Sequence, residues 1–237
     1  GAFIPSYPDV LEAPEFVLDN VLAAGTVVIA GQRGLGKTSA VVPLMAIVTG
    51  LCTAVPLGAS VRRKVIYVSE DTAQVHRILH AMRKGGHINR TPAEINKAFK
   101  LVQGSRLAPN KIVELKPLLE KHWLDNETAS GGNYSAPPVI VLDTTNATID
   151  IENISDNSQV SKAISELRNG FGEIPLVLVG HTPKTSLVNL RQQSFVGAGS
   201  WEGDTQQNLY LIMENDIRSL VIGKNRFSPE VAEYALN

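Results

Sequence analysis

Short apolar runs rich in valine, isoleucine and leucine recur along the chain, and longer amphipathic patterns lie between them. The apolar runs cover residues 26–31, 64–70, 99–104, 138–143 and 175–181. Near-continuous runs of this kind are typical of strands buried on both faces, as in a parallel sheet. The patterns between them predict helices over about 37–50, 72–84, 111–124 and 157–169, and the last helix is expected to stop at Gly170.

The pattern changes after residue 181. Two further apolar runs, at 208–214 and 219–225, flank the turn signal Asn215-Asp216 and predict a hairpin. The expected fold is therefore α/β, with a mostly parallel central sheet flanked by helices and an antiparallel hairpin at its C-terminal edge. We expect one domain over residues 1–237, with 1–15 as an N-terminal extension.

Two long polar segments, 125–138 and 182–203, are expected to be loops of functional importance or high mobility. Composition narrows the protein class further. The net charge of −1 does not suggest nucleic acid, although a basic patch can sit on a neutral protein. The single cysteine, Cys52, rules out an internal disulfide framework and a zinc motif. We expect a cytoplasmic protein, because neither a signal peptide nor a membrane-spanning run is visible.

The stretch "GQRGLGKT" at residues 31–38 matches the phosphate-binding pattern G-x-x-x-x-G-K-[ST] at every fixed position. A β-branched strand precedes it and a helical pattern follows, as a phosphate loop (P-loop) requires, which makes an accidental glycine-rich turn the weaker interpretation. Backbone N–H groups and the positive end of the helix would face the phosphates of a nucleoside triphosphate. The predicted nucleotide-binding residues are Gly31, Gln32, Arg33, Gly34, Leu35, Gly36, Lys37, Thr38 and Ser39.

Within this loop Lys37 would supply charge to the outer phosphates, and the Thr38 hydroxyl would ligate Mg²⁺. The strand at 139–143 ends in Asp143, whose carboxylate would hold the same Mg²⁺ through water. The alternative is that Asp143 only begins a turn. Because Thr144 and Thr145 follow Asp143, the acid that activates water must come from elsewhere in the chain.

Two further strand ends carry polar side chains. The strand at 64–70 ends in Glu70, followed by Asp71, and the strand at 175–181 ends in His181. Glu70 could orient or deprotonate the attacking water, whereas Asp71 or Thr72 could cap the next helix. His181 could sense the γ-phosphate, or it could be an ordinary satisfied polar residue.

The order "GQRGLGKTS", "VIYVSEDT", "VIVLDTTNATIDIENISDNSQV" and "LVLVGHTPKT" resembles the RepA-type hexameric helicase branch of the RecA-like P-loop ATPases, over residues 16 to 228. The resemblance implies that Glu70 is catalytic, that Asp143 binds Mg²⁺ and that His181 follows the fourth core strand. It also implies a ring-forming, DNA-dependent ATPase whose nucleotide lies between subunits.

One feature departs from this family. The family often carries an arginine after the segment corresponding to "GSWEGD", where this chain has Gln206 and Gln207. The last hairpin instead ends in "GKNRF", which resembles DnaB-type helicases. By that resemblance Lys224 and Arg226 would reach a neighbouring subunit's nucleotide and stabilise charge during hydrolysis. A solvated strand end is the alternative.

These features predict an ATP- and Mg²⁺-dependent helicase or translocase. Its expected partners are single-stranded DNA and further copies of the chain in a hexamer. Loops 144–157 and 182–203 would face DNA, with Lys184 and Arg191 as phosphate contacts, although the first loop is acidic. The alternatives are a recombinase-like or regulatory ATPase that does not unwind DNA, and the ATPase module of a larger replication protein.

Overall fold

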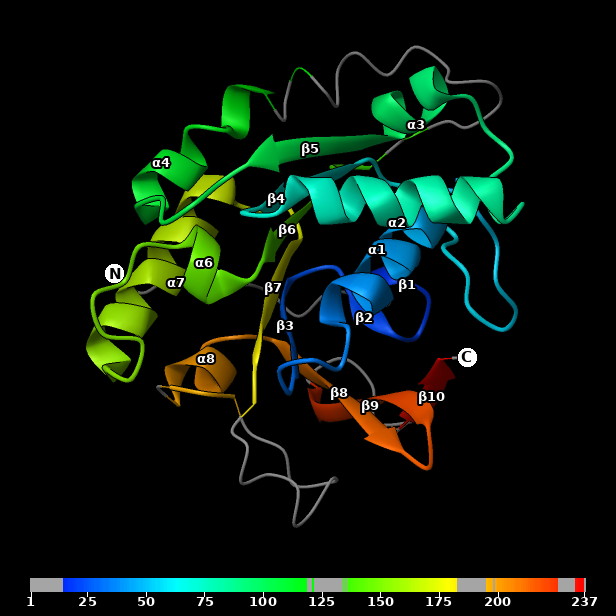
Figure 1. Ribbon diagram of the computed structural model, residues 1–237. Helices are drawn as coiled ribbons and strands as arrows, with labels where there is room; N and C mark the ends of the chain where they lie inside the picture. The colour runs from blue at the N-terminus through cyan, green and yellow to red at the C-terminus, as the bar shows by residue number, and fades with distance from the viewer. Residues whose placement is uncertain are drawn as a thin grey trace, which may run out of the picture.

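The computed structural model describes residues 15–118, 121, 134, 136–182, 195–197, 199–225 and 233–236. An eight-stranded sheet lies between two layers of helices (Figure 1). Its strands in chain order are β3 (Thr26–Gly31), β4 (Val65–Ser69), β5 (Phe99–Gln103), β6 (Val139–Asp143), β7 (Leu176–His181), β8 (Gln207–Glu214), β9 (Ile217–Asn225) and β10 (Glu233–Leu236). A small ribbon of β1 (Phe16–Leu18) and β2 (Leu22–Ala23) precedes them.

The strand order across the sheet is β10-β9-β8-β3-β7-β6-β4-β5. The six strands from β8 to β5 run parallel, and β9 and β10 are antiparallel additions at the far edge. This arrangement confirms the predicted fold class. Parallel pairing also aligns the carboxyl ends of the strands, so Gly31 lies opposite His181 and Ser69 lies opposite Asp143.

Helices cover both faces of the sheet because the strand side chains alternate between two apolar cores. One core packs α1 (Lys37–Val48), α2 (Thr72–Lys84) and α3 (Pro92–Ala98) against residues such as Val27 and Tyr67. The other packs α4 (Pro109–Val113), α7 (Asn157–Phe171) and α8 (Ser200–Gly203) against residues such as Val28 and Ile66. Within the described ranges, each helix is too short or too polar to cross a lipid bilayer.

Several sequence predictions need correction. Helix α7 continues through Gly170 to Phe171 and is capped by Gly172, whose φ is +64°. Gly170 serves packing instead, because an added Cβ would lie 2.4 Å from the Val113 side chain on α4. The helix predicted over 111–124 is interrupted by a turn at residues 114–115 after the short α4, and most of 119–133 lies outside the described residues.

The other differences concern edges and loops. The hairpin is confirmed, and both turn residues, Asn215 and Asp216, have the positive φ values of a two-residue hairpin loop. The hairpin is not outermost, however, because β10 pairs with β9. Part of the expected loop 144–157 is the helical turn α6 (Thr145–Thr148). Of the expected loop 182–203, residues 183–194 lie outside the described residues.

Candidate nucleotide site

The phosphate-binding loop connects β3 to α1 at the carboxyl end of the sheet. Gly34 and Gly36 have φ values of +86° and +73°, a conformation that side-chain-bearing residues rarely adopt. Gly36 is also the N-cap of α1, so the first turn of the helix, with its unpaired N–H groups, opens at the loop. The loop backbone therefore has the shape and the polarity that an anion needs.

Lys37 is held at the mouth of this loop. Its ammonium Nζ donates to the carbonyl oxygens of Gly31, at 3.0 Å, and Gln32, at 2.9 Å. Burial lowers the pKa of Lys37 to about 8; nearby Asp143 opposes this shift and Arg33 adds to it. The side chain is therefore still mostly protonated at neutral pH, and a phosphate would find a positioned cation.

Asp143, at the end of β6, is the centre of a buried hydrogen-bond cluster. Its Oδ2 accepts from the Thr38 hydroxyl at 2.8 Å and from the Tyr67 hydroxyl at 2.6 Å. Burial raises the pKa of Asp143, against the opposing effects of these two hydrogen bonds and of the Lys37 charge. The other oxygen, Oδ1, is buried and has no hydrogen-bond partner among the described residues.

These residues fit a magnesium ion. Mg²⁺ is usually held by one or two oxygen ligands from the protein, together with waters and substrate phosphates. The Thr38 hydroxyl and the Asp143 carboxylate are side by side, and Asp143 Oδ1 is a buried acceptor still available for a water or a cation. Tyr67 fixes the orientation of the carboxylate by its hydrogen bond. Sequence analysis missed this role, because a tyrosine in an apolar strand has no local motif.

The structure assigns the helix cap to Asp71, whereas the catalytic role of Glu70 stays a prediction. Asp71 caps α2, because its side chain accepts from the backbone N–H of Gln74 at 2.9 Å. Glu70 is exposed, directly after Ser69, which lies opposite Asp143 in the sheet. Its backbone carbonyl accepts from the Gln103 side chain on β5. Glu70 is thus beside the cluster with its carboxylate uncommitted to the cap.

His181, at the end of β7, lies opposite the first glycine of the loop. Its Nδ1 is buried and has no hydrogen-bond partner among the described residues. The pKa of His181 is lowered to about 4, mainly by burial and also by the nearby charges of Lys37 and Arg33. The imidazole is therefore neutral near pH 7, so it can exchange hydrogen bonds at the site but adds no charge.

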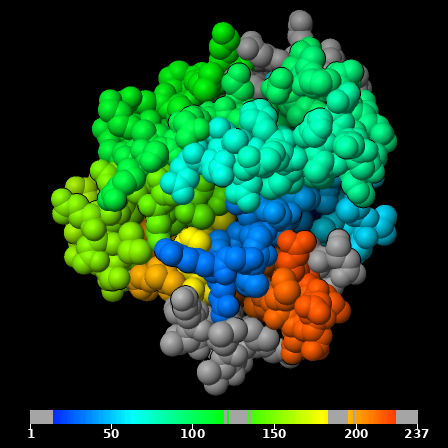
Figure 2. Space-filling view, in the orientation of Figure 1, coloured from blue at the N-terminus to red at the C-terminus, as the bar shows by residue number. Residues whose placement is uncertain are grey.

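Arg218, on β9, was missed by sequence reasoning. Its Nη1 lies 3.2 Å from the position of a Cβ built on Gly36, so the guanidinium borders the phosphate loop of its own chain. The guanidinium of Arg218 makes no hydrogen bond or ion pair within the described part of the chain. The sheet topology explains its position. Because β8 runs parallel to β3, both strands end beside the phosphate loop, and the two-residue turn after β8 starts β9 there. Figure 2 shows the orange hairpin bordering the blue N-terminal region that contains the loop.

Of the four remaining predicted residues, the structure describes one, Lys224, and it is not brought to this site. Lys224 lies at the opposite end of β9 from Arg218, because its neighbour Asn225 pairs with Gln207 at the start of β8. The hairpin register therefore separates Lys224 from the chain's own P-loop. Arg226, Lys184 and Arg191 lie outside the described residues.

A phosphate loop after one parallel strand, with an acid at the end of a second and polar residues ending two more, defines a RecA-like P-loop ATPase by fold and site. The chain belongs to the AAA domain family AAA_25, whose profile matches residues 6–186. Comparison with curated proteins gave no significant sequence match.

Solved structures support the same fold. The crystal structure of a KaiC-like protein from the hyperthermophilic archaeon Pyrococcus horikoshii aligns with a TM-score of 0.58 and 12% identity, over 94% of this chain and 91% of that one. The crystal structure of the RadB recombinase aligns with a TM-score of 0.51 and 17% identity, over 90% of this chain and 86% of that one. Neither of these two relatives is described as a helicase.

Proposed function

We propose that this protein binds and hydrolyses ATP with Mg²⁺, and that it is a recombinase-like or regulatory RecA-fold ATPase rather than an unwinding motor. The observation that carries the ATPase proposal is the contact between Thr38 and Asp143 beside the buried Lys37. We retain the expectation of one domain and of a homo-oligomer.

Each residue of the site has a distinct task in this proposal. The loop backbone and Lys37 bind the β- and γ-phosphates, while Thr38 and Asp143 hold Mg²⁺. Bound Mg²⁺ neutralises charge on the phosphates and helps to orient them. Glu70 orients the attacking water and accepts its proton, and His181 reports the state of the γ-phosphate by hydrogen bonding. Arg218 contacts the phosphates from the same chain.

The choice of a regulatory or recombinase-like role rests on the comparisons. A KaiC-like protein and a recombinase align over most of this chain, and the departure at Gln206 and Gln207 weakens the RepA-type resemblance. The K-x-R sequence at 224–226 favours the DnaB-type helicase as the second candidate. Both roles allow single-stranded DNA as a partner and a neighbouring subunit at the nucleotide.

A strand-displacement assay distinguishes these two roles. The purified protein is given ATP, Mg²⁺ and a fork with single-stranded tails, and ATP turnover is followed in the same reactions, with a mass measurement in solution. We expect ATP turnover without strand separation. Strand separation that requires ATP and is lost in Lys37→Ala would favour the helicase and overturn the regulatory proposal.

A further inference from the structure

We infer that a groove between α2, α3 and β5 is a binding surface for single-stranded nucleic acid. The groove is separate from the nucleotide site. Strand β5 is at the edge of the sheet, and β4, β6 and β7 lie between it and the P-loop strand β3. The groove borders Phe99 at the start of β5, opposite Val65 at the start of β4, whereas Glu70 follows the other end of β4.

The segment that forms most of the groove is basic. Residues 72–100 contain six lysine or arginine residues and one glutamate, a formal charge of +5, together with three of the five histidines. The whole chain carries −1, so all the rest of it carries −6. A local group of basic residues on an otherwise acidic protein can attract a polyanion. The net charge of the whole chain does not reveal such a group.

Local pairing cancels part of this charge, because Arg77 lies 3.9 Å from Asp71, which directly precedes the segment. The single carboxylate, Glu94, accepts from the Thr91 backbone N–H and hydroxyl as part of a capping box, and it lies 3.7 Å from Arg90. Arg83 donates through Nε to the Arg90 carbonyl oxygen at 3.0 Å, which anchors its guanidinium. Within the described residues, the terminal nitrogens of Arg83 have no acidic partner.

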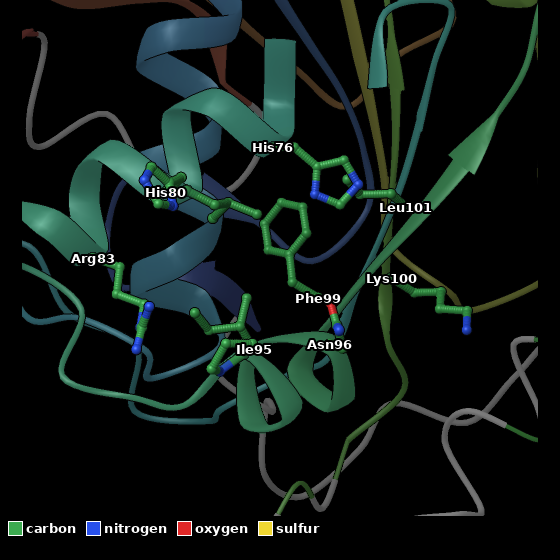
Figure 3. A pocket seen from close by; sticks show the side chains of 10 residues that line it. His76, His80, Arg83, Ile95, Asn96, Phe99, Lys100 and Leu101 are labelled. Carbon is green, nitrogen blue, oxygen red and sulfur yellow. The ribbon is translucent and has the colours of Figure 1, made fainter. Parts of the chain in front are cut away.

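The groove is hollow, with an apolar floor and a polar rim. A cavity of about 360 Å³ has the buried side chains of Leu79, Ile95 and Phe99 as its floor. Exposed polar side chains, among them His76 and Arg83, form its rim, and none of the described residues that line it is a carboxylate. Figure 3 shows Phe99 in the middle of the groove, between side chains of α2: His76 lies on one side, and His80 and Arg83 lie on the other.

A second hollow of about 810 Å³ extends the first along α2. The two share His80 and Arg83, and the second adds the cations Lys84 and Arg90 together with one carboxylate, Glu94. An elongated concave surface with several cations suits a chain of phosphates better than it suits one small anion.

The same residues favour a nucleic acid over an acidic protein segment, and a single strand over a duplex. His76 and His80 present exposed flat rings, on which unpaired bases can stack, and the Asn96 amide can hydrogen-bond a base edge. In a duplex, neighbouring bases already cover these faces. A carboxylate chain would use the cations but would have no use for the rings.

The test measures binding of a fluorescein-labelled oligothymidylate by fluorescence anisotropy over a series of salt concentrations. Arg83→Glu/Lys84→Glu reverses two exposed charges in the groove, and His80→Ala removes one ring. The matched control, Lys111→Glu/Lys162→Glu, reverses two exposed charges on α4 and α7, on the opposite face of the sheet.

We expect the groove reversal to weaken binding by about tenfold or more and to reduce the slope of log K against log salt by about two, one for each lost phosphate contact. His80→Ala should weaken binding less and leave the slope unchanged. The control should bind like the wild type, and a duplex should bind more weakly than the single strand. An oligouridylate arm tells RNA from DNA, and binding of either supports the inference.

Equal affinity and slope in the groove reversal would overturn the inference, and so would tighter binding of polyglutamate than of the oligonucleotide. ATP turnover without nucleic acid is measured on the same samples and should be unchanged. If the groove reversal weakens oligonucleotide binding but the wild type does not hydrolyse ATP, only the proposed function is rejected. Normal turnover with unaltered binding would reject this inference alone.

Discussion

At the scale of single residues, Asp143 decides what the site can hold. A buried carboxylate is costly unless it is paired, and here it receives two hydroxyl hydrogen bonds with Lys37 nearby. Its second oxygen has no partner among the described residues, which is expected of a group that completes its coordination with a cation or water. This arrangement supports the proposal that Asp143 holds Mg²⁺.

Glu70→Gln should leave ATP binding intact and lower turnover by about 10² to 10⁴, because an amide cannot accept the proton of water. The check is steady-state ATP turnover, with binding of a fluorescent ATP analogue measured in parallel. Asp71→Asn is the matched control, since asparagine still caps α2. Normal turnover in Glu70→Gln and loss of turnover in Asp71→Asn would show that the other acid is catalytic.

Arg218→Ala should weaken ATP binding by about tenfold or more, because a hydrogen bond to a charged group is worth about 1.5–3 kcal/mol. AMP lacks the outer phosphates and should lose less affinity. Isothermal titration of both nucleotides checks this. Equal losses for ATP and AMP would place Arg218 away from the phosphate chain.

At the scale of elements, the sequence predicted whatever depends on local pattern. The buried parallel strands, the limits of α2 and the Asn215-Asp216 turn follow from apolar runs and turn residues. The end of α7 did not, because Gly170 and Gly172 are equally good local stops and only packing against Val113 distinguishes them. Long-range contacts of this kind leave no periodicity in the sequence.

The site shows the same division. The P-loop and the strand-end residues Glu70, Asp143 and His181 could be placed in advance, since carboxyl ends of parallel strands share one edge. Tyr67 and Arg218 could not, because one points inward from an apolar strand and the other depends on the hairpin register. Neither position carries a local motif.

Gly180→Ala tests how closely the Phe195 ring packs against β7. An added Cβ would lie 2.0 Å from the Phe195 ring, so the ring must move and the protein should lose about 1–3 kcal/mol of folding stability. Urea denaturation measures the loss. Gly203→Ala, where nothing lies within 4 Å of the added Cβ, should change stability little. Equal stability of both variants would show that Phe195 is not packed on Gly180.

At the scale of the whole molecule, the register of the hairpin limits which nucleotide Lys224 could reach. Arg218 lies at the phosphate end of β9 and Lys224 at the other end, so one strand has a basic residue at each end of the sheet. Lys224 lies far from its own P-loop along β9, so any action on a nucleotide would be on one that belongs to a neighbouring subunit. For Arg226 the same action in trans stays a prediction. A surface role in solvent is the alternative.

Mixing Arg226→Ala with Lys37→Ala subunits tests this action in trans. Each pure variant should be inactive, since an arginine supplied from a neighbour contributes about 10³ or more in rate. Mixed assemblies contain interfaces with an intact P-loop facing an intact Arg226, so partial ATP turnover should return. A fully active Arg226→Ala variant, or a fully active monomer, would contradict action in trans.

The central claim is ATP hydrolysis at the P-loop, and steady-state phosphate release with ATP and Mg²⁺ tests it most directly. The wild-type protein and the Lys162→Ala control, altered at an exposed residue of α7, should turn over equally. Lys37→Ala should fall to the background rate, and chelation of Mg²⁺ by EDTA should stop the wild-type reaction. Wild-type turnover in Lys37→Ala, or no turnover in the wild type under any of these conditions, would contradict the claim.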